Sequence, residues 1–108
     1  MDLNLVVVSG RLAAPPELRT FDSGSRLIRY LITCRTDEPR RRVDVIPVTQ
    51  WDPPADSVAF DAAPGTAVWV AASAQRRFWG EAEGRRSRLE IVADQVCFRT
   101  HGAETDLH

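Results

Sequence analysis

The stretch RLIRYLITCR at residues 26–35 decides the fold of this chain, because its apolar side chains recur at every second residue. Successive side chains of a β-strand point to opposite faces of a sheet. One face of this strand is therefore apolar and is expected in the core: Ile28, Tyr30, Ile32 and Cys34. The other face is basic and mixed, and it is expected to be available to a ligand: Arg29, Leu31, Thr33 and Arg35.

Further strand-like runs lie on both sides of this stretch, separated by turn residues. The first run, at residues 3–10, has apolar residues at both odd and even positions, which predicts a strand that is covered on both faces of the sheet. Pro15-Pro16 then bends the chain at a corner, and Pro47, which has no N–H to donate, must face an edge or a bulge. Five main strands are expected at residues 3–10, 26–35, 43–49, 66–77 and 85–98, with a short strand-like run at 18–21 and a two-turn helix over 56–63.

Five short strands, two corner-turning segments and one helix between the third and fourth strands predict an all-β fold, a five-stranded Greek-key barrel of OB type. Periodicity alone leaves a sandwich or an SH3-like barrel open. A chain of 108 residues has room for a single core. We expect one domain over residues 1–98, followed by a short, polar and disordered tail over 99–108.

Composition excludes several classes of protein. No apolar run approaches the ~18 residues of a membrane span, and the N-terminus lacks the features of a signal peptide, so a cytoplasmic protein is expected. Cys34 and Cys97 are interpreted as thiols that pack in strands, because no paired Cys or His spacing supports a zinc site with His101 and His108. No nucleophile–base pair or phosphate loop is present, so we expect neither an enzyme nor a metal or cofactor.

Arginines cluster around aromatic residues in one hairpin, although the net charge is only −1. All 14 basic residues are Arg. Cations along a groove together with exposed aromatic rings are what capture of single-stranded nucleic acid requires. The hairpin residues expected to bind nucleic acid are Arg76, Arg77, Phe78, Trp79, Arg85 and Arg86, with Arg88 in the same cluster. The alternative is a solvated hairpin with one Trp packed inward.

Several segments resemble the bacterial single-stranded DNA-binding proteins. LNLVVVSGRL at residues 3–12, with PELR at 16–19 and the turn Ser23-Gly24, is similar to the opening strand, corner and turn of that family. PGTAVWV at 64–70, RRFW at 76–79 and LEIVADQV at 89–96 resemble its later strands. The resemblance implies an OB fold, binding of single-stranded DNA without sequence preference, and an accessory role in replication, repair or recombination.

Departures from that family matter as well. Aromatic residues expected in the third strand appear as Arg42 and Val48, which thins the stacking platform. Arg42 is nevertheless expected to bind nucleic acid, because its guanidinium can pair with phosphate and stack on bases; the alternative is a solvated charged loop. We expect no counterpart of the long Gly/Pro/Gln-rich tail with an acidic tip through which the family recruits replication and repair enzymes. Three further arginines extend the predicted surface, or else form surface ion pairs of little energetic consequence: Arg19, Arg29 and Arg35.

An oligomer is predicted from apolar residues on exposed positions. Trp69 takes the strand parity opposite to Val68 and Val70, which suggests a subunit interface with Leu5 and Val7 of the first strand. Trp51 is interpreted as a cover for one end of the barrel. The partners expected are single-stranded DNA, further copies of the chain and a homologous single-stranded DNA-binding protein. The rival hypothesis is an OB-fold interaction module of primosomal type with weak or no DNA binding.

Overall fold

The computed structural model describes residues 1–54, 61–80, 84 and 86–99 of the chain. The fold of the described residues is all-β. The strands are β1 (Val6–Leu12), β2 (Glu17–Thr20), β3 (Arg26–Thr36), β4 (Arg42–Trp51), β5 (Ala67–Trp79) and β6 (Arg86–Arg99).

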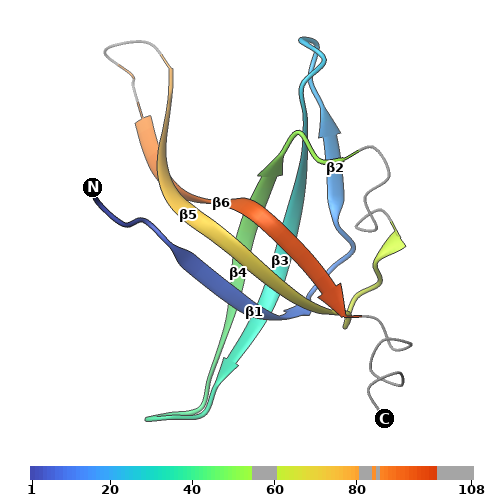
Figure 1. The fold of residues 1–108 in the computed structure, drawn as a ribbon, viewed down its shortest axis with the longest axis vertical. Coiled ribbons are helices and arrows are strands. Elements are labelled where there is room, and N and C mark those ends of the chain that lie inside the picture. Colours follow the sequence, from blue (N-terminus) through green and yellow to red (C-terminus); the bar gives the residue numbers. More distant parts are fainter. Residues whose placement is uncertain (55–60, 81–83, 85, 100–108) are drawn as a thin grey trace.

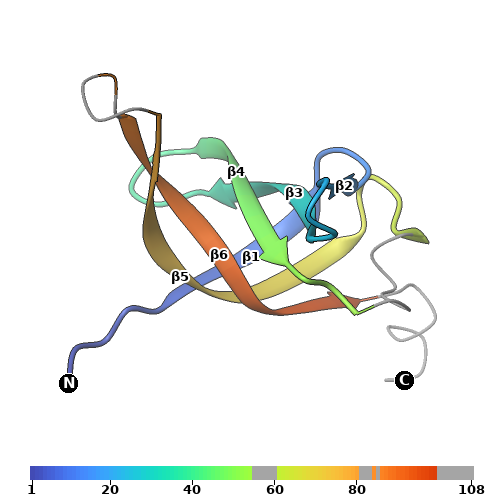
Figure 2. The same cartoon turned by 90° about the horizontal axis from the view of Figure 1, so that it is seen from above.

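One continuous sheet closes on itself to form the barrel (Figure 1, Figure 2). Its strand order is β1-β5-β6-β4-β3-β2, and β1 also pairs with β3, so β1, β3, β4, β5 and β6 form a closed ring. All pairings are antiparallel except that of β4 with β6. This confirms the predicted five-stranded barrel; the run at 18–21 forms β2, an extra strand that pairs only with β3.

The core confirms the alternation of residues 26–35. Ile28, Tyr30 and Ile32 are fully buried, and they pack with inward side chains of β1, β4, β5 and β6. The Tyr30 hydroxyl donates a hydrogen bond to Oε1 of Gln50, 2.7 Å away, on the paired strand. Buried polar groups need such partners, so this hydrogen bond allows the Tyr30 hydroxyl to be buried in an otherwise apolar core.

Gly10 lies inside β1 and does not end it, contrary to the expected strand over residues 3–10. Strand β1 pairs with β5 through Val6–Arg11 and crosses to β3 at Arg11 and Leu12. A Cβ at Gly10 would collide with the backbone carbonyl oxygen of Thr33. Only glycine therefore lets β1 approach β3 closely enough to close the barrel.

The prediction that the first strand is covered on both faces is wrong for the single chain. Val8 and Leu12 are buried, whereas Leu5 and Val7 on the other parity are exposed. The reason is that β1 packs on the core with one face only, and its outer face has no covering element among the described residues.

Pro47 sits where its missing N–H does no harm. It lies opposite Leu31, whose carbonyl accepts a hydrogen bond from the N–H of Ala13 and so points away from β4. The nitrogen of Pro47 therefore faces β6. Strands β4 and β6 share a single register pair among the described residues, Thr49 with Val92, in line with the expected edge position.

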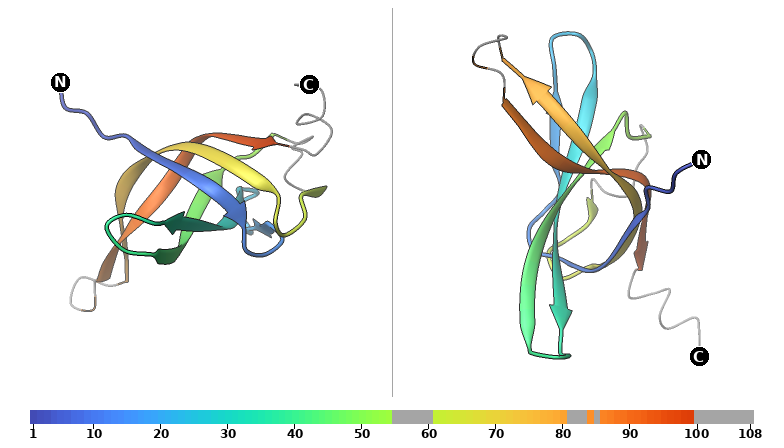
Figure 3. Two further views of the ribbon diagram at one scale, coloured as in Figure 1. Left: turned by 90° about the horizontal axis from the view of Figure 1, so that it is seen from below. Right: turned by 90° about the vertical axis from the view of Figure 1, so that its left-hand side faces the viewer.

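Three hairpins extend beyond the barrel (Figure 3). The β5–β6 arm and the β2–β3 hairpin project from the same end of the molecule, where β4 also ends, and the β3–β4 hairpin projects from the opposite end. A register shift between Ala71 and Ala72 bends the β5–β6 pair as it leaves the barrel. The first end thus gathers parts of five strands, β2 to β6, around one surface.

Three other expectations need correction or concern residues that the structure does not describe. The helix over 56–63 lies mostly at residues 55–60, outside the described residues, and its described end at 61–63 contains no α-helix. Cys97 is exposed on the outer face of β6, so it does not pack in this chain as expected, while Cys34 is half-buried. The predicted tail after Arg99 also lies outside the described residues.

Candidate nucleic-acid interface

A groove of about 310 Å³ lies between the β2–β3 hairpin and the β5–β6 arm. Four of its seven lining residues are arginines, and two are aromatic. The lining consists of Arg19, Phe21, Leu27, Arg29, Arg77, Trp79 and Arg88. We call this surface the arginine groove. A smaller hollow continues from it over Pro47 and Thr49, with Arg29, Arg88, Leu89 and Glu90 around it.

Register explains why these side chains share one face. Arg19 pairs with Leu27, and Leu27 pairs with Trp51, so these three residues form a row across β2, β3 and β4. Residues opposite one another on paired strands point to the same face. The row is turned away from the core, because Ile28 and Gln50, one step along, point inward.

Trp51 lies under the groove and joins both of its walls. Its ring stacks on Phe21 with centroids 5.9 Å apart and planes inclined by 25°. The Cζ of Arg77 lies over the same ring, 5.0 Å from its centroid. The expectation that Trp51 merely covers a barrel end is therefore wrong, since it connects the β2–β3 hairpin to the β5–β6 arm.

Trp79 forms the other aromatic wall. It is 45% exposed, and the Cζ of Arg88 lies 5.7 Å from its ring centroid. Trp79 pairs with Arg86, and Arg77 pairs with Arg88, so all four side chains leave the arm on the same face. Of the arginines predicted around Trp79, Arg77, Arg86 and Arg88 share its face of the arm.

One acid lies among these cations. Glu90 is 9% exposed, and its Oε2 lies 3.7 Å from Nη1 of Arg77. Its Oε1 and the Nε of Arg29 are buried without a hydrogen-bond partner. A buried polar atom without a partner is costly. On this side of the groove, these two atoms make no hydrogen bond within the protein and could bond to a ligand.

Some predicted site residues lie elsewhere. Arg76 and Phe78 occupy the opposite face of the arm from Trp79, where Nη1 of Arg76 donates to Oγ of Ser87 at 3.2 Å. Arg35 and Arg42 lie toward the β3–β4 hairpin, and Arg42 is paired with Asp44 at 3.0 Å. Arg85 falls outside the described residues. The groove thus collects Arg19, Arg29, Arg77 and Trp79 from the predicted set, with Arg86 on the same face of the arm.

Phe21, Trp51 and Glu90 were missed as site residues. Trp51 has a signal in the sequence, because it shares its parity with Pro47 and Thr49 and not with the buried Val48. Val48 is itself in the core and is not available for stacking. Phe21 also has a signal, because it shares its parity with Arg19 in the strand-like run at 18–21, although in the structure it follows β2 at the start of a turn.

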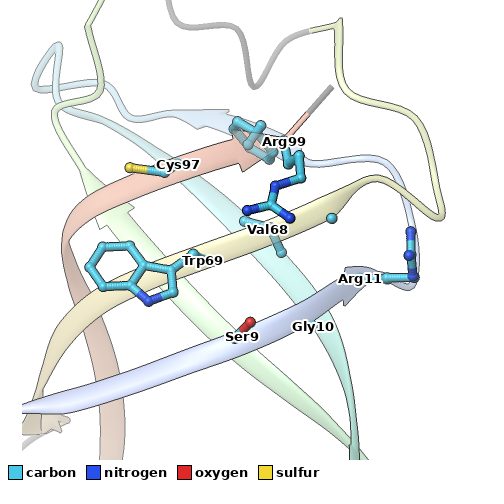
Figure 4. Close-up of a pocket in the computed structure, with 9 residues that line it drawn as sticks. Ser9, Gly10, Arg11, Val68, Trp69, Cys97 and Arg99 are labelled. Atoms are coloured by element: carbon cyan, nitrogen blue, oxygen red, sulfur yellow. The ribbon is translucent and has the colours of Figure 1, made fainter. Parts of the chain in front are cut away.

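A second feature is the apolar outer face of β1, β5 and β6 (Figure 4). Trp69 is 41% exposed and lies between Ser9 of β1 and Cys97 of β6 in one register row. Val7, on the same face, is 53% exposed. Arg11 and Arg99 flank the Trp69 row at one end of this surface.

The histidine, cysteine and acidic side chains of the described residues are dispersed. No three His, Cys, Asp or Glu side chains among them gather as metal ligands would. No helix in the described part of the chain is long and apolar enough to cross a membrane.

The closed barrel, with a groove of arginines and aromatic rings between two hairpins, defines an OB-fold protein. The chain belongs to the single-strand binding protein family, whose model matches residues 3–99. It is 32% identical over 110 residues to single-stranded DNA-binding protein 3 of Clostridium acetobutylicum, covering 96% of this chain and 76% of that protein. It is 30% identical over 105 residues to the single-stranded DNA-binding protein of Clostridium tetani, covering 93% and 72%.

The fold is also similar to that of a solved structure, an SSB of Plasmodium falciparum in complex with ssDNA. The TM-score is 0.72 at 16% sequence identity, and the match covers 93% of this chain and 97% of that chain. This likeness supports the barrel fold that the register of the strands defines.

Proposed function

We propose that this protein binds single-stranded DNA without sequence preference, through the arginine groove. The observation that carries the proposal is the convergence of four arginines and two exposed aromatic rings from separate hairpins on one surface. Membership of the single-strand binding protein family and the names of its relatives support the same function.

The groove offers both interactions that an unpaired strand needs. Unpaired bases expose their faces and stack on aromatic rings, at about 1–3 kcal/mol per base. Guanidinium groups pair with phosphate in a bidentate manner and also stack on bases. Neither interaction reads base edges, so binding through these contacts does not depend on sequence.

The positive charge of the groove is local. The whole chain carries a formal charge of −1, so a uniform attraction to polyanions is excluded. Among the groove arginines, Arg19 is engaged by Glu17 at 2.8 Å and Arg77 approaches Glu90 at 3.7 Å. Binding is expected to strengthen markedly at low ionic strength, because each phosphate contact made by these arginines releases counterions from the DNA.

We further propose that the functional unit is a dimer or tetramer formed through the outer face of β1 and β5. Leu5, Val7 and Trp69 are exposed there, and β1 presents a free edge over most of its length. An apolar face beside an open edge invites pairing with another copy.

We place the protein in the cytoplasm, bound to DNA, as a non-catalytic accessory in replication, repair or recombination.

The same apolar face favours a second candidate function, that of an interaction module which pairs with a homologous single-stranded DNA-binding protein. A titration separates the two functions. An unstructured single-stranded oligonucleotide and its duplex are added to the protein at two salt concentrations, and tryptophan fluorescence is followed. We expect quenching by the single strand that weakens with salt, and little quenching by the duplex. Absence of both effects at low salt would overturn DNA binding in favour of the interaction module.

A further inference from the structure

Phe21 is the aromatic ring that the β2–β3 hairpin presents to the arginine groove. It is 41% exposed and lines the groove, whereas Trp51 beneath it does not. A ring that is stacked on one partner yet open to solvent has one side left for a ligand. Phe21 is therefore exposed enough to contact a ligand, and its ring is held in place by stacking on Trp51.

A chain of contacts fixes the position of this ring. Glu90 in the groove floor lies 3.7 Å from Arg77, whose Cζ is 5.0 Å from the Trp51 ring centroid. Trp51 in turn stacks on Phe21 at 5.9 Å. Both ends of the chain are anchored, because Glu90 is 9% exposed and the backbone N–H of Phe21 donates to the carbonyl of Ser25 at 2.9 Å.

The end of β4 is fastened at the same place. The N–H of Asp52 donates to the carbonyl of Arg26 at 2.9 Å, and a guanidinium nitrogen of Arg26 donates to the carbonyl of Pro53 at 3.3 Å. These bonds hold Trp51 against β3. A ring whose support is already ordered loses little conformational freedom when a base stacks on it, which favours binding.

We propose that Phe21 is a second base-stacking residue of the arginine groove, on the wall opposite Trp79, and that Trp51 and Arg77 are the residues that position it. The inference rests on the proposed binding of single-stranded DNA and adds a contact to it. Bases stack on Phe21 and Trp79, while Arg19 and Arg29 near Phe21 receive the phosphates between them. Trp51 lies against both Phe21 and Arg77, and it holds the Phe21 ring in place.

The test compares three variants, each of which lacks one phenylalanine, and measures their affinity for one unstructured oligonucleotide. Phe21→Ala should weaken binding at least fivefold, and Phe21→Leu should weaken it nearly as much, because leucine fills the space but lacks a π-face. Phe78→Ala is the matched control, since Phe78 lies on the other face of the arm and outside the groove. Thermal unfolding verifies that each variant is folded.

Photo-crosslinking provides a second readout that does not depend on the stability of a variant. The unmodified protein is irradiated with an oligonucleotide that carries 5-iododeoxyuridine, and the linked peptides are sequenced. Adducts at both Phe21 and Trp79 are expected. Adducts at Trp79 without Phe21, together with an unchanged affinity of Phe21→Ala, would overturn this inference while DNA binding stands. Failure of the parent protein to bind any single strand refutes the proposed function itself.

Discussion

Arg77 and Arg88 lie directly opposite each other on β5 and β6, yet each guanidinium lies over a different tryptophan, Trp51 and Trp79. Like charges in a cross-strand pair are destabilising. Among the described residues, the acid that lies beside this pair is Glu90. An anionic ligand would relieve the repulsion between the two arginines, which supports the proposal that they bind DNA.

The salt dependence of binding tests this pair. Replacing both residues, Arg77→Gln with Arg88→Gln, should lower the slope of log affinity against log salt by about 1.4, because each phosphate contact on a single strand releases about 0.7 counterions. Fluorescence titrations over a range of salt concentrations give the slope. Arg76→Gln is the matched control, since Arg76 lies on the other face of the same arm. Equal slopes for the double variant and the control would refute the assignment.

Trp79 should carry the largest single stacking contribution. Trp79→Ala is expected to weaken single-strand binding by about 1–3 kcal/mol while the barrel stays folded, because the ring lies on the arm, outside the core. Quenching by an oligonucleotide should be much smaller in the variant than in the parent. If quenching persists in full, the signal comes from Trp51 or Trp69 and the role of Trp79 fails.

Alternation predicted the barrel because one parity of each main strand supplies most of its buried apolar side chains, although Leu27 of β3 and Thr49 of β4 are buried on the other parity. Residues 26–35 show this most clearly, since Ile28, Tyr30 and Ile32 are buried as expected. Alternation failed for the first strand, where apolar residues at both odd and even positions indicated that both faces are covered. Leu5 and Val7 are exposed in the single chain, and sequence periodicity does not distinguish a face covered by the same chain from one covered by another.

Four residues of the candidate site were predicted from the sequence, Arg19, Arg29, Arg77 and Trp79, whereas the aromatic contact between the two hairpins was not. Arg77, Arg88 and Trp79 are close in sequence, so their clustering was visible. Phe21 and Trp51 are 30 residues apart and meet because β3 places the end of β2 beside the end of β4. Such a contact depends on sheet register, which composition and periodicity do not define.

Oligomer formation is tested by placing charge on the outer face of β1. Val7→Glu should convert a dimer or tetramer to smaller species, because burying an unpaired carboxylate in an apolar interface is costly. Sedimentation velocity at micromolar concentration measures the change. Val45→Glu, at a similarly exposed position on β4, is the control and should leave the assembly intact. A parent protein that sediments as a monomer throughout would refute the oligomer.

Gly10 should be among the positions least tolerant of substitution. Gly10→Ala places a methyl group against the carbonyl of Thr33, and its carbon would also lie 3.1 Å from Cγ2 of Ile32. Because backbone cannot rotate away as a side chain does, we expect a loss of unfolding free energy of about 1–3 kcal/mol or more. Chemical denaturation measures it. Gly84→Ala, where no atom lies within 4 Å of the added carbon, should be nearly neutral.

Because of Tyr30, the free energy of unfolding should decrease at alkaline pH. Burial raises the pKa of Tyr30 from the ordinary 10.0 to about 12, and the phenol is the only tyrosine in the chain. Below about pH 10 the phenol is neutral in both the folded and the unfolded chain, so the fold loses nothing. Between about pH 10 and 12 the unfolded chain ionises first, and stability should fall by about 3 kcal/mol as pH rises through the folded pKa. Denaturation at a series of pH values measures this loss, and phenolate absorbance should appear together with unfolding. Tyr30→Phe, which also removes the bond to Gln50, should lack this dependence. A phenolate that titrates near pH 10 in a chain with native circular dichroism would show that the ring is not sealed in the core.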